Sequence, residues 1–119
     1  MRVLIAVATY NEVENIPTLI ERLNQIVPDA DILIVDDDSP DGTGQWCKEA
    51  SGVNDHLDVI IRKDERGLGS ATIRGMQEAI GRGYDAWLGM DADFSHPPEK
   101  VPALISRLAD SGEREVDVV

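Results

Sequence analysis

Two carboxylates, Asp91 and Asp93, are separated by a single residue and directly follow an apolar run that is typical of a buried strand. A tight turn at this point could direct both side chains at one ion instead of leaving them on opposite faces of the sheet. Carboxylate oxygens favour hard divalent cations, and water and phosphate oxygens complete the open positions of Mg²⁺ or Mn²⁺. A solvated acidic turn is the alternative explanation. We favour the metal site, because ligands of parallel sheets gather at strand ends.

The segments around this pair alternate between short apolar runs and stretches with helical periodicity. Such alternation predicts an α/β fold, with a Rossmann-like, mostly parallel sheet that has helices on both faces. We expect strands at residues 2–8, 31–36, 57–61 and 84–90, and helices at residues 16–27, 43–50, 70–80 and from about residue 97 onward. A fifth strand begins at Val116 and is cut off at Val119, so we expect residues 1–119 to be part of a longer, truncated domain.

Polar segments follow the first two predicted strands. In the first segment, Tyr10 could stack on a nucleobase and Glu12 could accept a hydrogen bond from it. Glu12 could equally lie in the first turn of the next helix, where the helix dipole favours a carboxylate. Three adjacent aspartates begin the second segment. We assign Asp38 and Asp41 to the turn, and we consider Asp37 a candidate acceptor for a base or ribose, as in dinucleotide-binding folds.

A glycine-rich segment follows the third predicted strand and leads into a helix N-terminus, where free N–H groups attract anions. Arg66 adds a cation beside it, although a bare G-x-G also serves plain entry into a helix. We therefore consider Arg66, Gly67 and Gly69 as candidate residues on the phosphate side of a site. His96 follows the fourth strand, and we expect a polar loop residue there, because the metal site already has two carboxylates.

The composition of the chain limits its partners. The 119 residues include 11 Lys and Arg against 23 Asp and Glu, a formal net charge of -12. This charge argues against nucleic acid and against an anionic membrane surface, and an acidic protein that binds an anionic substrate needs a cation between them. Cys47 stands alone, so we expect no internal disulfide and a semi-buried thiol in a reducing compartment. The N-terminal apolar run is too short to span a bilayer and lacks a cleavage pattern, which indicates a cytoplasmic protein.

Taken together, the four strand-end segments resemble the GT-A glycosyltransferases of family 2, and within it the dolichol-phosphate or polyprenyl-phosphate mannose synthases. They occur in the order of that family and cover nearly the whole chain. The motifs that carry the resemblance are Thr9-Tyr10-Asn11-Glu12 with Glu14-Asn15-Ile16, Val35-Asp36-Asp37-Asp38-Ser39-Pro40-Asp41-Gly42-Thr43, Arg66-Gly67-Leu68-Gly69-Ser70-Ala71 with Gly75-Met76, and Asp91-Ala92-Asp93-Phe94-Ser95-His96-Pro97.

The resemblance implies roles for individual residues. Asp91 and Asp93 are implied as the catalytic pair that holds Mg²⁺ or Mn²⁺, with Ala92 beside the donor diphosphate and Ser95 as a further metal contact. Ala8 stands where relatives often have proline, a change that a backbone contact tolerates. The residues implied to surround the donor nucleotide are Ala8, Tyr10, Glu12, Val35 and Asp37.

The implied reaction is the inverting transfer of a hexosyl group, mannosyl in the first instance, from a nucleotide-sugar donor such as GDP-mannose to a polyprenyl phosphate. The metal would stabilise the departing diphosphate as a Lewis acid. A phosphate acceptor is already largely ionised at neutral pH and needs cations more than a general base. The sequence offers no clear cationic acceptor site, so we expect the acceptor-binding residues and any membrane contact to lie beyond Val119.

Three alternatives stay open at this point. The chain could be a non-catalytic nucleotide-binding module, or a phosphotransferase with Asp91 as nucleophile and Asp93 as acid and base. It could also be a family 2 enzyme with a UDP-sugar donor and another acceptor, including glucosyl or aminoarabinosyl transfer to undecaprenyl phosphate. Dinucleotide oxidoreductases, P-loop NTPases and α/β-hydrolases are disfavoured, because the sequence lacks G-x-G-x-x-G after the first strand, G-x-x-x-x-G-K-[ST] and G-x-S-x-G.

Overall fold

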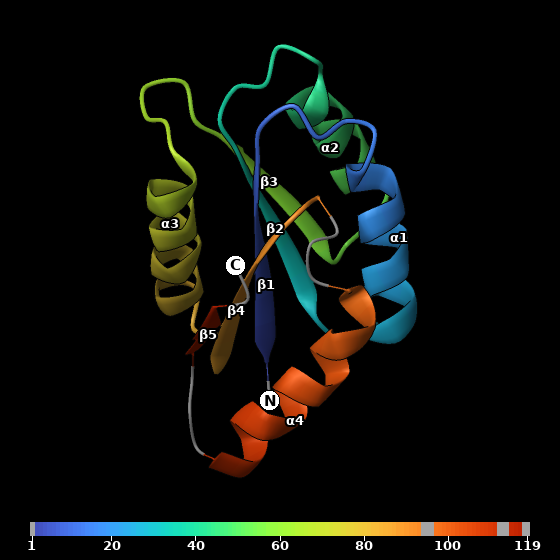
Figure 1. Cartoon of the computed structure of the whole chain (residues 1–119), viewed down its shortest axis with the longest axis vertical. Coiled ribbons are helices and arrows are strands. Elements are labelled where there is room, and N and C mark those ends of the chain that lie inside the picture. The colour runs from blue at the N-terminus through green and yellow to red at the C-terminus, as the bar shows by residue number, and fades with distance from the viewer. Residues whose placement is uncertain (1, 94–96, 112–114, 118–119) are drawn as a thin grey trace.

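The computed structural model describes residues 2–93, 97–111 and 115–117. Its centre is a parallel sheet with the strand order β3-β2-β1-β4-β5 (Figure 1). The strands are β1 (Val3–Thr9), β2 (Asp31–Asp36), β3 (Leu57–Ile61), β4 (Ala86–Asp91) and β5 (Glu115–Asp117). The helices are α1 (Ile16–Ile26), α2 (Thr43–Ser51), α3 (Leu68–Gly81) and α4 (Val101–Ser111), the last preceded by the short 3-10 helix η1 (Pro98–Lys100).

The strands and helices predicted from the sequence are confirmed, with shifts at their ends. The shift that matters most for the site is in β4, which begins two residues later than predicted and includes Asp91 as its last residue. Asp91 belongs to the strand because it pairs with Ala8 of β1. The helix α3 begins at Leu68, two residues earlier than predicted, and α2 ends against Gly52 as its composition indicates.

Helices cover both faces of the sheet, as predicted. Figure 1 shows α1, α2 and α4 on one face and α3 on the other. The side chains of β1 alternate between these layers: Ile5 and Val7 belong to the core under α1 and α4, while Leu4 and Ala6 belong to the core under α3. Every residue of β1 is buried, as expected for the central strand of a parallel sheet whose two faces are both covered.

Gly75 allows α3 to approach β1 closely. A Cβ atom at this position would lie 2.5 Å from the Cβ of Ala6, a distance that real side chains do not reach. Because the neighbouring atom is a methyl group attached directly to a strand, it has little freedom to move aside. Glycine at this position therefore sets the distance between α3 and the sheet.

The chain changes direction across the sheet after β3. β2 lies on one side of β1, whereas α3 carries the chain across to β4 on the other side. In open α/β sheets such a switch leaves a crevice at the carboxyl ends of the two strands that flank it. Those strands are β1 and β4, and their paired ends are Ala8 and Asp91.

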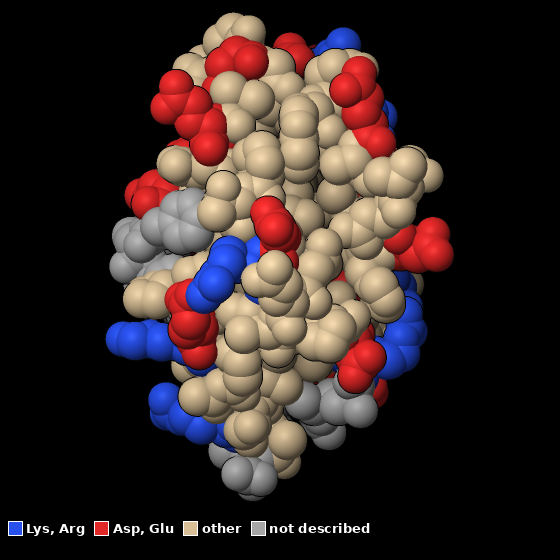
Figure 2. All heavy atoms as spheres, turned by 90° about the vertical axis from the view of Figure 1, so that its right-hand side faces the viewer, with Lys and Arg blue, Asp and Glu red and all other residues tan. Residues whose placement is uncertain are grey.

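The surface over α1, α2 and α4 carries charges of both signs. Figure 2 shows acidic side chains spread over this face, with basic side chains interspersed mainly in its lower half and no continuous basic area in view. A separate property concerns membranes: none of the helices in the described ranges combines the length and the apolar composition that crossing a bilayer requires.

Candidate functional site

A pocket of about 420 Å³ lies at the carboxyl ends of β1 and β4, where the strand order predicts a crevice. All of its lining residues are candidates from the sequence, and they come from the ends of β1 and β4 and from the loops after β1, β2, β3 and β4. The structure thus brings together segments that are far apart in the chain. The lining residues are Ala8, Tyr10, Glu12, Asp37, Arg66, Gly67, Asp91, Ala92 and Asp93.

Two other candidates, Val35 and Gly69, do not line this pocket. Val35 is 1% exposed and belongs to the core between the sheet and α3. Gly69 lies in the first turn of α3, with open space beside it, and it does not line the pocket. Ser95 and His96 lie outside the described residues.

The acidic pair projects from the end of β4. Asp91 is half-buried, Asp93 is exposed, and Ala92 between them is 1% exposed and packs into the core. The buried methyl group of Ala92 anchors the turn, so both carboxylates lie at the pocket. Among the described residues, no three His, Cys, Asp or Glu side chains form a metal-binding group. Two carboxylates with water and substrate phosphate oxygens nevertheless form a usual ligand set for Mg²⁺.

Hydrogen bonds tie the loop after β1 to the loop after β2. The hydroxyl groups of Ser39 and Thr43 and the carboxylate of Asp41 accept backbone N–H groups of the first loop. These bonds hold the segment that carries Tyr10 and Glu12 against the second loop. The donor–acceptor pairs are Asp37 N–Thr9 O at 3.1 Å, Asn11 N–Ser39 Oγ at 2.9 Å, Glu12 N–Thr43 Oγ1 at 3.0 Å and Val13 N–Asp41 Oδ2 at 3.1 Å.

The structure confirms the turn role that the sequence predicts for Asp41. Partial burial alone would raise its pKa, but hydrogen bonds from Thr43 and from the backbone of Val13 outweigh burial and lower the pKa below its ordinary value. Asp38 has a left-handed backbone with φ 54, which aspartate tolerates better than most residues and which also fits its predicted turn role.

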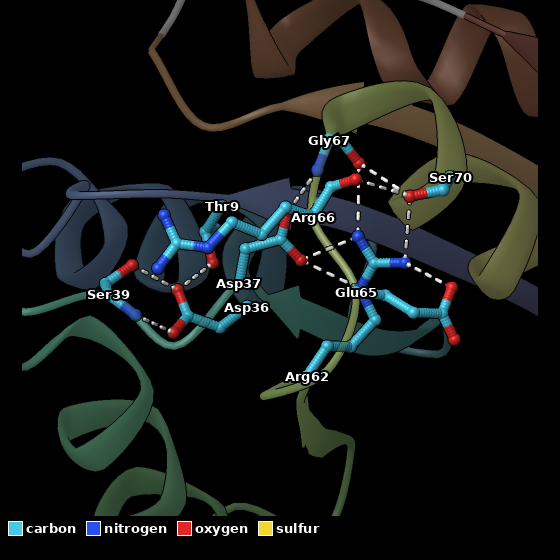
Figure 3. A network of polar contacts seen from close by, with 9 residues as sticks. All are labelled: Thr9, Asp36, Asp37, Ser39, Arg62, Glu65, Arg66, Gly67 and Ser70. Atoms are coloured by element: carbon cyan, nitrogen blue, oxygen red, sulfur yellow. Dashed lines mark hydrogen bonds and ion pairs between the residues drawn. The ribbon is translucent and has the colours of Figure 1, made fainter.

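Asp36 has a structural role and does not reach the pocket lining. It is fully buried, and its Oδ1 accepts hydrogen bonds of 2.6 Å from the hydroxyl groups of Thr9 and Ser39. Its Oδ2 accepts the N–H of Ser39 at 2.9 Å. Figure 3 shows this carboxylate between the end of β1 and the loop after β2. Asp36 thus fixes the strand ends from which the site residues project.

Glu12 and Tyr10 form one wall of the pocket. The amide of Asn15 donates a hydrogen bond of 2.9 Å to Glu12 Oε2, so the carboxylate is braced from its own loop. Glu12 precedes α1, whose first turn contains no acidic residue, and the alternative placement in that turn is therefore wrong. Tyr10 is 41% exposed, and the guanidinium of Arg66 lies 5.7 Å from the centre of its ring. Arg66 lines the pocket beside Tyr10, and its expected place on the phosphate side stays a prediction.

Asp37 is bound to a residue that the sequence analysis missed. Its Oδ1 accepts a hydrogen bond of 2.7 Å from Nε of Arg62 and lies 2.6 Å from Nη2 in an ion pair, and its Oδ2 accepts the N–H of Gly67 at 2.8 Å. The two side chains are only 3% and 6% exposed, so this is a buried ion pair. A signal was available in the sequence, because Arg62 directly follows an apolar strand, where a charged side chain that becomes buried needs a partner.

Comparison with known proteins identifies the family. The model of glycosyl transferase family 2 matches residues 4–118 of the chain. The chain belongs to glycosyltransferase family 2. Its fold agrees with that of a mannosyltransferase from Pyrobaculum calidifontis solved in complex with GDP-Man and Mn²⁺, with a TM-score of 0.75 at 23% identity, over 92% of this chain and 32% of that one. The predicted GT-A fold is thereby confirmed.

Two curated proteins are similar in sequence over most of the chain. An undecaprenyl-phosphate mannosyltransferase from Micrococcus luteus is 46% identical over 105 residues, which are 88% of this chain and 43% of the relative. A polyprenol monophosphomannose synthase from Mycolicibacterium smegmatis is 40% identical over 118 residues, which are 98% of this chain and 43% of the relative. The chain therefore spans less than half the length of these relatives.

Proposed function

We propose that the chain supplies the donor-binding part of an inverting glycosyltransferase. The reaction is the transfer of a hexosyl group, mannosyl by the names of the similar relatives, from a nucleoside-diphosphate sugar such as GDP-mannose to a polyprenyl phosphate. The observation that carries this proposal is the pocket at the ends of β1 and β4, which unites candidate residues from four separate loops. Its volume of about 420 Å³ lies in the range of pockets that bind small molecules, roughly 300–1,000 Å³.

The formal charges around the pocket favour a divalent cation. Four carboxylates line the pocket, those of Glu12, Asp37, Asp91 and Asp93, together with one cation, Arg66. With the buried guanidinium of Arg62 behind Asp37 included, an excess of two formal negative charges is left. A pocket of this charge would repel a diphosphate. One Mg²⁺ or Mn²⁺ removes the excess, and the two aspartates on β4 provide the oxygen ligands that these ions prefer.

The lining residues divide into two ends. At the nucleoside end, the exposed ring of Tyr10 offers a face for a base, and the carboxylates of Glu12 and Asp37 accept hydrogen bonds from base N–H or ribose O–H groups. At the diphosphate end, Asp91 and Asp93 hold the cation. The cation, when bound, supplies Lewis-acid stabilisation of the departing diphosphate. Ala92 keeps the acidic turn against the core, so the two carboxylates stay directed at the diphosphate.

In this proposal, the groups that bind the acceptor lie outside the segment of the relatives that the chain matches. Binding a polyprenyl phosphate needs cations, whereas in the described part of the chain the pocket lining contains only one, Arg66 beside Tyr10. The two curated relatives are more than twice as long as the matched segment. We therefore assign residues 1–119 to donor binding and place the acceptor-binding groups in regions of the relatives that the chain does not match.

Calorimetric binding of GDP and UDP, each with and without Mn²⁺, tests the proposal. For the unaltered chain we expect Mn²⁺ to raise nucleotide affinity by about tenfold or more, a change of roughly 1.4 kcal/mol. Asp93→Ala removes one proposed ligand, so Mn²⁺ should no longer raise the affinity. Asp29→Ala is the matched control, because Asp29 is an exposed aspartate between α1 and the start of β2 and does not line the pocket. The control should behave as the unaltered chain does.

The same titrations contain the results that would contradict the proposal. Nucleotide binding that does not depend on Mn²⁺ and is unchanged in Asp93→Ala would remove the acidic pair from the donor site. Tighter binding of GDP than of UDP supports a GDP-sugar donor. The reverse order would overturn the mannosyl assignment and favour a UDP-sugar enzyme of the same family.

A further inference from the structure

Arg62 is a buried cation at the carboxyl end of β3. Its backbone N–H donates a hydrogen bond of 2.7 Å to the carbonyl of Asp36, which extends the pairing of β3 with β2 by one residue. Its side chain is 3% exposed and is not part of the pocket lining. The backbone of Arg62 is therefore held by its pairing with β2, and its guanidinium is held by the buried surroundings of the side chain.

The guanidinium of Arg62 joins three segments of the chain (Figure 3). Nε and Nη2 contact Asp37 at the end of β2, and Nη2 also donates to the carbonyl of Gly67 at 3.1 Å. Nη1 donates to Ser70 Oγ in the first turn of α3 at 3.1 Å and to Glu65 Oε2 at 3.4 Å. A planar fork with several N–H donors can make these contacts together, whereas the single ammonium group of lysine cannot.

These contacts determine how Asp37 faces the pocket. Oδ1 of Asp37 contacts both Nε and Nη2 of Arg62, while among the described residues Oδ2 accepts only the N–H of Gly67. A carboxylate oxygen accepts about two hydrogen bonds, so Oδ2 keeps capacity for a ligand donor. The carbonyl of Gly67 is bound to Arg62 while its N–H is bound to Asp37, which holds the loop of residues 62–67 as part of the same unit.

Arg62 also changes the charge that a nucleotide meets at this end of the pocket. Without a buried cation beside it, the carboxylate of Asp37 would be costly to bury and would repel an anionic ligand. The ion pair offsets both costs and leaves a hydrogen-bond acceptor at the pocket wall. Asp91 and Asp93 lie at the end of β4, on the other side of β1 from the strand that leads to Asp37.

We propose that Arg62 is a positioning residue for the nucleoside end of the donor pocket. It orients Asp37 and the loop of residues 62–67 so that Asp37 Oδ2 accepts a hydrogen bond from the base or ribose of a nucleoside diphosphate. Arg62 itself does not touch the ligand. This inference rests on the proposed function, but it concerns a residue and an end of the pocket that metal binding does not involve.

The test compares two ligands that share a diphosphate and differ in the nucleoside. Calorimetry in Mn²⁺ gives the affinities of GDP and of inorganic diphosphate for the unaltered chain, for Arg62→Lys and for Asp37→Asn. We expect Arg62→Lys to weaken GDP binding on the order of tenfold, the effect of losing one hydrogen bond to a charged group. Binding of inorganic diphosphate should stay within about twofold, because it depends on the acidic pair. Asp37→Asn should give the same pattern, and the double variant should lose no more than either single variant.

The controls separate positioning from stability. Arg82→Lys is the matched substitution, because Arg82 lies at the C-terminal end of α3 and pairs with Asp58 and Glu78 outside the pocket. It should leave both affinities unchanged. If Arg62→Lys does not fold, which circular dichroism reveals, Ser70→Ala replaces it: this variant removes one contact of Nη1 and should weaken GDP binding by a smaller factor with diphosphate binding retained.

Three outcomes overturn the inference. An equal loss for GDP and inorganic diphosphate means that Arg62 only supports the fold. No loss for GDP in Arg62→Lys and Asp37→Asn means that neither side chain serves the nucleoside. An unaltered chain that binds inorganic diphosphate in Mn²⁺ but binds neither GDP nor UDP more tightly refutes the proposed function itself, and the inference with it.

Discussion

Substitution of Gly75 by alanine should destabilise the fold through one contact. The added Cβ would lie 2.5 Å from the Cβ of Ala6 and 3.4 Å from Nε1 of Trp87, so α3 must shift away from β1. Overpacking of this kind costs about 1–3 kcal/mol, and the higher helix propensity of alanine offsets up to about 1 kcal/mol of it. We therefore expect Gly75→Ala to lower the free energy of unfolding by about 1–2 kcal/mol.

Urea unfolding followed by circular dichroism measures this change, with Gly69→Ala as the control in the same helix. No atom lies within 4 Å of a Cβ built at Gly69, so the control should be as stable as the unaltered chain or slightly more stable. With a slope of about 2 kcal/mol per molar urea, the midpoint of Gly75→Ala should fall by about 0.5–1 M at an unchanged slope. Equal midpoints for Gly75→Ala and Gly69→Ala would show that the close approach of α3 to β1 is not as the structure has it.

Two groups with a shifted pKa lead to further predictions. Burial, with a smaller effect of the Asp36 charge, raises the pKa of Cys47 to about 12, so a thiol reagent should modify it only as the chain unfolds, and rapid labelling of the native protein would contradict its burial. Burial alone would raise the pKa of Asp31, but hydrogen bonds with Tyr84 and His56 lower this pKa below 3.8. The contribution of ionised Asp31 to the free energy of unfolding is therefore present above pH 3.8 and is lost as pH falls through the lowered pKa. Tyr84→Phe should reduce this acid loss of the urea midpoint, and an unchanged loss would exclude the Tyr84 contact as its cause.

The sequence sufficed to predict the sheet and most of the pocket, for a physical reason. Strands of a parallel sheet that is covered on both faces are continuous apolar runs, so their ends are marked by the first polar residues. Because all the strands run in one direction, those polar residues meet at one edge. Tyr10, Asp37 and Asp93 are separated by long stretches of chain, yet each could be assigned to the pocket from its position directly after a strand.

Contacts that depend on side-chain direction could not be predicted in this way. Val35 is next to the strand end in sequence, but it points into the core under α3, as alternate residues of a strand do. The pair of Arg62 and Asp37 joins two loops, and its geometry depends on the pairing of β2 with β3. The place of Arg66 beside Tyr10 likewise follows from the path of a loop, which sequence periodicity does not specify.

The three aspartates at the end of β2 explain why neighbouring residues of one type can have different functions. Asp36 is the last residue of the strand and points to Thr9 and Ser39, whereas Asp37 points to the opposite side, toward Arg62. Asp38 leaves the strand with a positive φ and turns the chain toward α2. Because each direction follows from the position relative to the strand end, insertion of one residue before Asp36 would exchange these environments. The spacing of this motif is therefore set by the alternation of the strand and not by the carboxylates alone.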